Sequence, residues 1–168
     1  DLREGLGRDT EGLSVLLVEM EDAGGKGLTM QRIDVMINHQ TNALFFDKRE
    51  VPAENLILGR GRGFEVAQGR LGPGRIHHCM RAIGQAERAL ELLCQRAVAR
   101  EAFGKKIADL GANHDIIAEC RIEIEMTRLL CLKAAWMMDN VDKREAAHWI
   151  SQIKVAAPRM ALKVVDEA

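Results

Sequence analysis

Apolar residues are spaced in two different ways along the chain, and the pattern changes near residue 60. Before that point the apolar runs are short, and the run over residues 13–18 has the length and compactness of a buried strand. We expect two further strands over residues 28–36 and 42–50, with a flexible turn over the glycine-rich residues 23–27. The third strand ends at Pro52, because proline has no N–H for strand pairing. The first part of the chain therefore predicts short strands joined by turns.

Beyond residue 63 the apolar residues recur every three or four positions, as they do on one face of a helix. The first such stretch begins near residues 72–74, where a proline suits the first turn of a helix. Polar segments at residues 109–113 and 140–142 separate it from two further stretches. These spacings predict two helices of about 25 residues and a third of about 22. The apolar positions that define the three stripes are Ile76, Met80, Ile83, Leu90, Leu93, Cys94 and Ala97; Ile116, Ile117, Cys120, Ile124, Thr127, Cys131, Ala134, Ala135 and Met138; and Ala146, Trp149, Ile150, Ile153, Ala157, Met160, Ala161 and Val164.

Three helices joined by short loops predict an up-down bundle in which neighbouring helices run antiparallel. Residues 59–63 contain three glycines and predict a hinge between the two parts of the chain. Three striped helices leave apolar surface uncovered, so we expect further helices beyond Ala168 or from another subunit. The chain begins at Asp1 without a methionine and ends without a helix-stop signal, which indicates a piece of a longer protein. The expected fold is an α+β fragment, an antiparallel β segment followed by a mostly α-helical up-down bundle.

Composition excludes several classes of protein. The chain has 168 residues, of which 47% are hydrophobic and 29% are charged, and 24 Lys and Arg against 25 Asp and Glu give a net charge of −1. This hydrophobic content argues against a disordered chain. The absence of a basic excess argues against a nucleic-acid partner. No apolar run approaches the ~18 residues that a membrane span requires.

Motifs for metal binding and nucleophilic catalysis are absent from the sequence. His77 and His78 are adjacent, so that on a helix they point about 100° apart. Because no H-E-x-x-H pattern accompanies them, we predict no metal site. Serine occurs only as Ser14 and Ser151, neither of them within a Gly-x-Ser-x-Gly turn. The cysteines lack C-x-x-C spacing and predict reduced core residues in a reducing compartment; they are Cys79, Cys94, Cys120 and Cys131.

Two basic segments, at residues 69–75 and 100–106, allow two interpretations. In the first interpretation, each segment is a cluster of solvated charges. In the second, an arginine in the segment binds a phosphate, because the planar guanidinium is able to form two parallel hydrogen bonds to it. One such hydrogen bond to a charged group is worth about 1.5–3 kcal/mol.

Short motifs in a fixed order resemble the acyl-CoA dehydrogenase family over nearly the whole chain. The stretch at residues 69–80 is most similar to members 10 and 11 of that family, which favour longer acyl chains. The motifs that carry the resemblance are Val51-Pro52-Ala53-Glu54-Asn55, Gly61-Arg62-Gly63-Phe64, Gly84-Gln85-Ala86-Glu87-Arg88-Ala89-Leu90 and Arg100-Glu101-Ala102-Phe103-Gly104-Lys105.

The resemblance implies both a domain organisation and a reaction. Residues 1–60 correspond to the C-terminal part of a middle β domain, and residues 61–168 to a truncated C-terminal helical bundle. Family enzymes are FAD-dependent and oxidise acyl-CoA to trans-2-enoyl-CoA in fatty-acid β-oxidation: a carboxylate removes the α proton and the β hydride passes to flavin N5. Most are homotetramers, dimers of dimers that share FAD between subunits. The implied partners are therefore acyl-CoA and further copies of the chain, and an electron-transfer flavoprotein remains open as electron acceptor.

The resemblance also implies roles for particular residues. Arg100, Phe103 and Gly104 match family residues that contact the FAD of a neighbouring subunit, and Arg75 matches an arginine beside the acyl-CoA pocket. In most members the catalytic base lies in a part of the bundle beyond Ala168. In a minority it directly precedes the arginine that matches Arg75, where this chain has Gly74. We therefore expect no catalytic base in this chain, and no turnover by the chain alone.

Three departures from the family pattern, at Gly72, Gly74 and Gly111, keep other functions open. Gly72 replaces an aspartate that binds CoA, and Gly111 replaces a glutamine that touches FAD. One alternative is a non-catalytic helical scaffold that keeps the fold, and another is a flavin-dependent acyl-CoA oxidase or monooxygenase. The sequence does not give the compartment. The family is expected in the mitochondrial matrix or peroxisome of a eukaryote, or in the cytoplasm of a bacterium.

Overall fold

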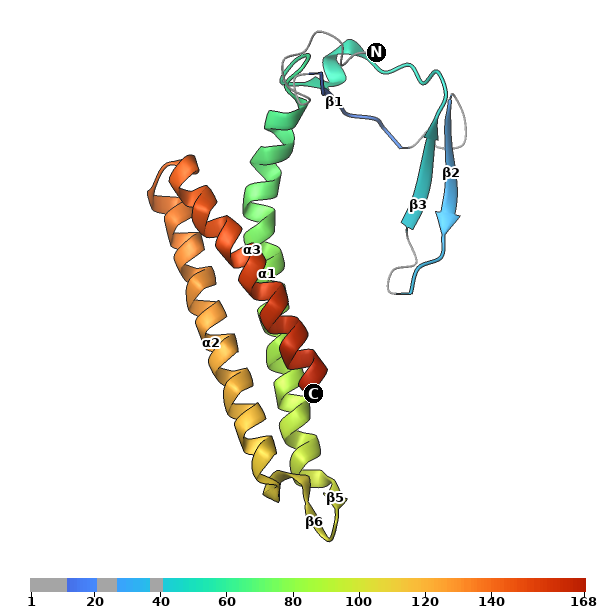
Figure 1. The fold of residues 1–168 in the computed structure, drawn as a ribbon. Helices are drawn as coiled ribbons and strands as arrows, with labels where there is room; N and C mark the ends of the chain where they lie inside the picture. Colours follow the sequence, from blue (N-terminus) through green and yellow to red (C-terminus); the bar gives the residue numbers. More distant parts are fainter. Residues whose placement is uncertain (1–11, 21–26, 37–40) are drawn as a thin grey trace. The chain divides into compact units, whose positions relative to one another are not determined.

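A computed structural model describes residues 12–20, 27–36 and 41–168, and divides the chain into two compact units, Asp1–Gly69 and Arg70–Ala168. Most of the turn predicted at residues 23–27 lies outside the described residues. The antiparallel β segment followed by helices is confirmed, and Figure 1 shows the order of these elements along the chain.

The first unit contains two antiparallel strand pairs. Strand β2 (Leu28–Ile33) pairs with β3 (Thr41–Phe46). The short strand β1 (Val15–Leu16) pairs with β4 (Leu56–Ile57), which follows the 3-10 helix η1 (Ala53–Asn55). The strands occur in the predicted places but end sooner than the apolar runs that predicted them.

The expectation that residues 13–18 form a buried strand was wrong. Only two of these residues pair with another strand, and Leu13, Leu16 and Leu17 are each at least half exposed. The remaining backbone bonds of this segment go to other partners: Leu17 N donates to Asn55 O (2.9 Å) and Gly63 N donates to Leu13 O (2.8 Å). An apolar run predicts burial only when a second layer covers it.

Helix α1 (Gly63–Ala99) has 37 residues and begins nine positions before Gly72, where the sequence pattern placed its start. Pro73 therefore lies inside the helix instead of in its first turn. A proline in a helix interior removes one hydrogen bond and costs about 3 kcal/mol. The helix nevertheless continues, since its later turns bury a long apolar stripe whose packing opposes that local cost.

Helices α2 (Gly111–Asn140) and α3 (Lys143–Glu167) are joined by a short connection and run antiparallel (Figure 1). Asp142 caps α3, because one of its carboxylate oxygens accepts hydrogen bonds from Arg144 N (2.7 Å) and Glu145 N (3.2 Å). The second and third helices thus begin and end close to the polar segments that predicted their limits. No described helix is both long enough and apolar enough to cross a membrane.

The core of the second unit forms where the three helical stripes meet. Ile124, Ile153 and Val164 are fully buried there. Two predicted core positions were wrong: Met80 is 58% exposed while its neighbour Cys79 is buried, and Met138 lies at the surface. In both cases the stripe is shifted by one residue from the predicted position, a change of about 100° around the helix.

Candidate functional site

A β-hairpin with a two-residue turn follows α1, and the three residues to which the resemblance gives a role in cofactor binding lie on it or directly before it. Strand β5 (Glu101–Ala102) pairs with β6 (Lys105–Lys106), and the 3-10 helix η2 (Ile107–Asp109) follows. Phe103 and Gly104 form the turn. Ile107 N donates to Arg100 O (3.0 Å), which closes the base of the hairpin.

The turn holds a bulky residue in a conformation that such residues rarely adopt. Phe103 has φ +56° and Gly104 has φ +78°, so both central residues of the turn are left-handed, as in a type I′ turn. Asparagine or glycine is preferred at the first of these positions, and another residue there costs about 1–2 kcal/mol. Phe103 is also 94% exposed. The backbone at Phe103 is therefore strained, and its aromatic ring is accessible to solvent.

Arg100 lies at the junction of α1 and the hairpin. Its backbone N–H donates to Arg96 O (2.9 Å), and its side chain is exposed. Within the described parts of the chain no carboxylate pairs with this guanidinium. The structure therefore places Arg100, Phe103 and Gly104 within five consecutive residues, with a cation and an aromatic ring both exposed.

Arg75 lies in α1 near the other end of that helix from the hairpin, and its side chain is half-buried. It is separated from Ala99 by 24 residues, which at 1.5 Å per residue is about 36 Å. Arg75 and the hairpin therefore cannot bind the same part of one ligand within a single chain.

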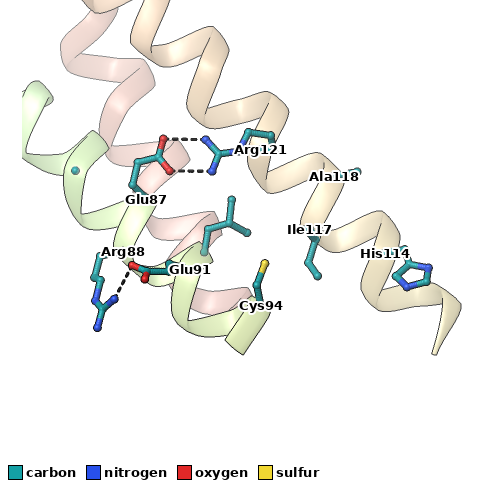
Figure 2. Close-up of a pocket in the computed structure, with 10 residues that line it drawn as sticks. Glu87, Arg88, Glu91, Cys94, His114, Ile117, Ala118 and Arg121 are labelled. Carbon is teal, nitrogen blue, oxygen red and sulfur yellow. Dashed lines mark hydrogen bonds and ion pairs between the residues drawn. The ribbon is translucent and has the colours of Figure 1, made fainter. Parts of the chain in front are cut away.

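A groove of about 870 Å³ lies between α1 and α2. Leu90 is one of its lining residues. Cys94, Ile117 and His114 also line it (Figure 2). Cys94 is free and half-buried, and among the described residues no hydrogen bond joins it to His114. His114 is exposed at the edge of this groove.

An ion-pair cluster borders the groove and joins the two helices. In Figure 2 the Glu87 carboxylate of α1 and the Arg121 guanidinium of α2 point toward one another, and two hydrogen bonds of 2.8 Å link them. Arg128 also donates to Glu87, while Glu125 accepts from both arginines at 3.1 and 3.2 Å. The hydrogen bond from Arg121 lowers the pKa of the Glu87 carboxyl, against an opposing effect of burial.

We expect Glu87→Gln to lower the free energy of unfolding by about 1 kcal/mol at pH 7, since the cluster is partly exposed. Because the folded-state pKa of Glu87 is lowered, its contribution is present above the ordinary glutamate value of about 4.3 and is lost as the pH falls through the folded value. Urea titrations of the wild type and the variant at pH 7 and pH 3.5 measure the loss in free energy of unfolding and its dependence on pH. The control is Glu91→Gln, which removes a pair within one helix. Equal losses for both variants, or no change with pH, would contradict an interhelical role.

The buried cysteines have no chemical activation. Burial raises the pKa of the Cys79, Cys120 and Cys131 thiols, so that they stay protonated near neutral pH. The Cys79 thiol donates to Ile153 O at 3.5 Å. All four cysteines are free; the predicted core position is confirmed for Cys79, Cys120 and Cys131, whereas Cys94 is half-buried. In residues 12–20, 27–36 and 41–168, no three His, Cys, Asp or Glu side chains come together as metal ligands.

Sequence reasoning missed the Glu87 cluster, although part of its signal is visible in the sequence. Arg121, Glu125 and Arg128 are spaced by four and three residues, which places them on one face of a helix. The contact with Glu87 depends on how α1 and α2 align along their lengths, and the spacing within one helix does not fix that alignment.

The sequence profile described as "Acyl-CoA dehydrogenase, C-terminal domain" matches residues 61–168. The chain is 57% identical over 121 residues to "Acyl-CoA dehydrogenase family member 11" of Gallus gallus, a match that covers 72% of this chain and 16% of that protein. It is 48% identical over 158 residues to "Acyl-CoA dehydrogenase family member 10" of Mus musculus, covering 92% of this chain and 15% of that protein.

The fold is also similar to that of solved structures. An acyl-CoA dehydrogenase-type structure from Mycobacterium abscessus matches with a TM-score of 0.85 and 44% identity, over 96% of this chain and 40% of that chain. The chain thus spans less than half of that structure and about a sixth of the two curated relatives.

Proposed function

The chain belongs to the acyl-CoA dehydrogenase family, and from that premise we propose that it forms part of an FAD-dependent oxidoreductase that converts acyl-CoA thioesters to trans-2-enoyl-CoA in fatty-acid β-oxidation. The observation that carries the proposal is the hairpin at residues 101–106. It presents the exposed ring of Phe103, and at its base lies Arg100, which has no acidic partner among the described residues; this pairing suits an aromatic ring system joined to a diphosphate.

The residues of the hairpin fit the chemical groups of FAD. Arg100 would hold the diphosphate through charge-assisted hydrogen bonds, and Phe103 would stack on the adenine. Gly104 permits the left-handed turn that exposes Phe103. When bound, FAD supplies the hydride acceptor for oxidation at the β carbon. These residues hold the cofactor and take no part in proton transfer.

Arg75 would bind the acyl-CoA thioester, and Gly74 beside it has no side chain with which to remove a proton. Removal of the α proton is therefore assigned to a carboxylate outside this chain. The distance of about 36 Å along α1 between Arg75 and the hairpin supports a shared arrangement, in which the hairpin serves the FAD of a neighbouring copy while Arg75 serves its own substrate.

An exposed apolar stripe on α2 supports assembly into a dimer of dimers. Its residues lie four, three and seven positions apart, on the face away from the buried stripe. Their side chains are 52% to 65% exposed. The Nζ atom of Lys133 lies 4.5 Å from the ring centre of Trp136. Several large apolar side chains exposed on one face of a helix are typical of contacts between subunits. The residues are Ile122, Met126, Leu129 and Trp136.

One alternative has a specific basis, a non-catalytic scaffold of the same fold. Gly72 and Gly74 remove two side chains with which family members bind or react with substrate, and Gly72 has open space around it. The visible spectrum of the longest natural form, purified without added cofactor, separates the two functions. Bound flavin supports the enzyme, whereas a folded helical oligomer without flavin supports the scaffold.

A further inference from the structure

The exposed apolar side chains of α2 are arranged symmetrically about Leu129, which is 65% exposed. Met126 and Leu132 lie three positions before and after it. Ile122 and Trp136 lie seven positions before and after it, and all five side chains are at least half exposed. Residues three, four and seven positions apart share one face of a helix. The five residues therefore form a single stripe, the α2 stripe, about 21 Å long.

Two charged residues on the same face are also symmetric about Leu129, but with opposite signs. Glu125 lies four positions before it and Lys133 four positions after it, and both are exposed. The Lys133 Nζ atom lies 4.5 Å from the ring centre of Trp136 and 5.4 Å from that of Trp149 on α3. Among the described residues no carboxylate pairs with this ammonium. The two rings thus hold a positive charge beside the α2 stripe, with N–H groups left to donate.

This pattern is complementary to itself in one orientation. When a two-fold axis passes beside Leu129, two copies of α2 run antiparallel, and each residue lies level with the residue equally far on the other side of Leu129. Apolar positions then meet apolar positions, and Glu125 of one copy lies level with Lys133 of the other. In a parallel pair each residue lies level with its own copy, so that like charges meet, which is unfavourable. The charges therefore select the antiparallel pair.

We propose that the α2 stripe binds the α2 stripe of a second copy of this chain, antiparallel, with Leu129 at the two-fold axis and Glu125 of each copy paired with Lys133 of the other. The inference rests on the proposed function in that it specifies one contact of the proposed dimer of dimers. Glu125 already accepts hydrogen bonds from Arg121 and Arg128 at 3.1 and 3.2 Å. A carboxylate has further lone pairs, so it is able to accept from the ammonium of the second copy as well.

Crosslinking of cysteine variants of the longest natural form tests this geometry. Leu129→Cys should link to a second copy through a short bis-maleimide, because the axis brings the two positions together. Ile122→Cys and Trp136→Cys should not, since each lies 14 residues, about 21 Å along the helix, from its own copy. The double variant with both changes should link, although neither single variant does. All three positions are exposed, so the substitutions should leave the fold intact.

The wild type, in which Cys94 is half-buried and the other cysteines are buried, gives the background of the crosslinking reaction. Equal linking of Leu129→Cys and Ile122→Cys would indicate a parallel pair. No linking of Leu129→Cys would mean that another surface or another protein covers the α2 stripe. Either result overturns the proposal.

Charge reversal tests the paired residues. Lys133→Glu should weaken association of the copies about tenfold, because it places two carboxylates together at both of the symmetry-related contacts. Lys133→Gln, which loses the same cation without the repulsion, should weaken it less. Adding Glu125→Gln to Lys133→Glu should recover most of the loss. Adding Glu123→Gln should not, since Glu123 pairs with Lys163 on α3. Sedimentation velocity over a range of protein concentrations measures association, and no recovery by Glu125→Gln would contradict the pairing.

Flavin content and flavin reduction by acyl-CoA, measured on the same samples, separate the interface from the proposed function. A protein that links through position 129 but contains no flavin supports the interface and contradicts the function. Flavin that acyl-CoA reduces in a protein that does not link through position 129 overturns the interface and leaves the function standing.

Discussion

Arg100→Ala should weaken FAD binding by the holoenzyme about 10- to 100-fold while leaving its helicity nearly unchanged. The guanidinium is exposed and has no acidic partner among the described residues, so its removal disturbs no ion pair there. A hydrogen bond to a charged group contributes about 1.5–3 kcal/mol, which corresponds to this change in affinity. FAD titration followed by flavin fluorescence measures the dissociation constant, and far-ultraviolet circular dichroism measures the helicity.

The control for this variant is Arg96→Ala, one turn earlier in α1. Arg96 is also exposed, but it lies in the last turn of the helix, before the hairpin. Its removal lowers the net charge by the same amount and should leave FAD affinity within about twofold of the wild type, since screening limits interactions between exposed charges. If both variants lose FAD equally, the effect comes from overall charge; if Arg100→Ala keeps full affinity, the assignment of Arg100 is wrong.

Phe103→Asn should change stability and cofactor binding in opposite directions. Asparagine adopts the left-handed conformation readily, so the variant relieves the strain at φ +56° and should gain about 1 kcal/mol of stability. The same change removes an aromatic ring that is 94% exposed, and stacking on a base is worth about 1–3 kcal/mol. We therefore expect FAD affinity to fall about tenfold while the unfolding temperature rises.

Phe103→Tyr is the matched variant, because it keeps the aromatic face at the same backbone position. It should bind FAD within about threefold of the wild type and retain the strain. If Phe103→Asn both raises stability and binds FAD as tightly as the wild type, Phe103 has no role in holding the cofactor. If the variant loses stability, the strain argument is wrong as well.

The helical part of the fold was predictable because its signals are local and repeated. Apolar residues at three- and four-residue steps gave all three helices, and the polar residues before Lys143 marked the start of α3. The start of α1 was missed because Pro73 is a local signal for a first turn, whereas packing along the rest of the helix carries it through. The packing of a long buried stripe thus outweighs the preference of a single proline for the first turn of a helix.

Some features of the candidate site were likewise predictable from local sequence, and others were not. The motif that contains Arg100 and Phe103 lies within a few residues, and the hairpin holds them close together. The conformation of Phe103 was not predictable, because Phe-Gly is not a preferred sequence for a type I′ turn. The pairing of Glu87 with Arg121 depends on how two helices align along their lengths. That alignment is not encoded in the spacing of residues along one helix.

The most direct test of the proposed function is reduction of bound flavin by substrate. The longest natural form, purified without added cofactor, is mixed with a long-chain acyl-CoA in the absence of oxygen while visible absorbance is recorded. We predict flavin absorbance that falls on addition of acyl-CoA, together with formation of trans-2-enoyl-CoA. Flavin that stays oxidised with acyl-CoA thioesters of every chain length and charge, or a folded protein without flavin, would contradict the assignment as an acyl-CoA dehydrogenase.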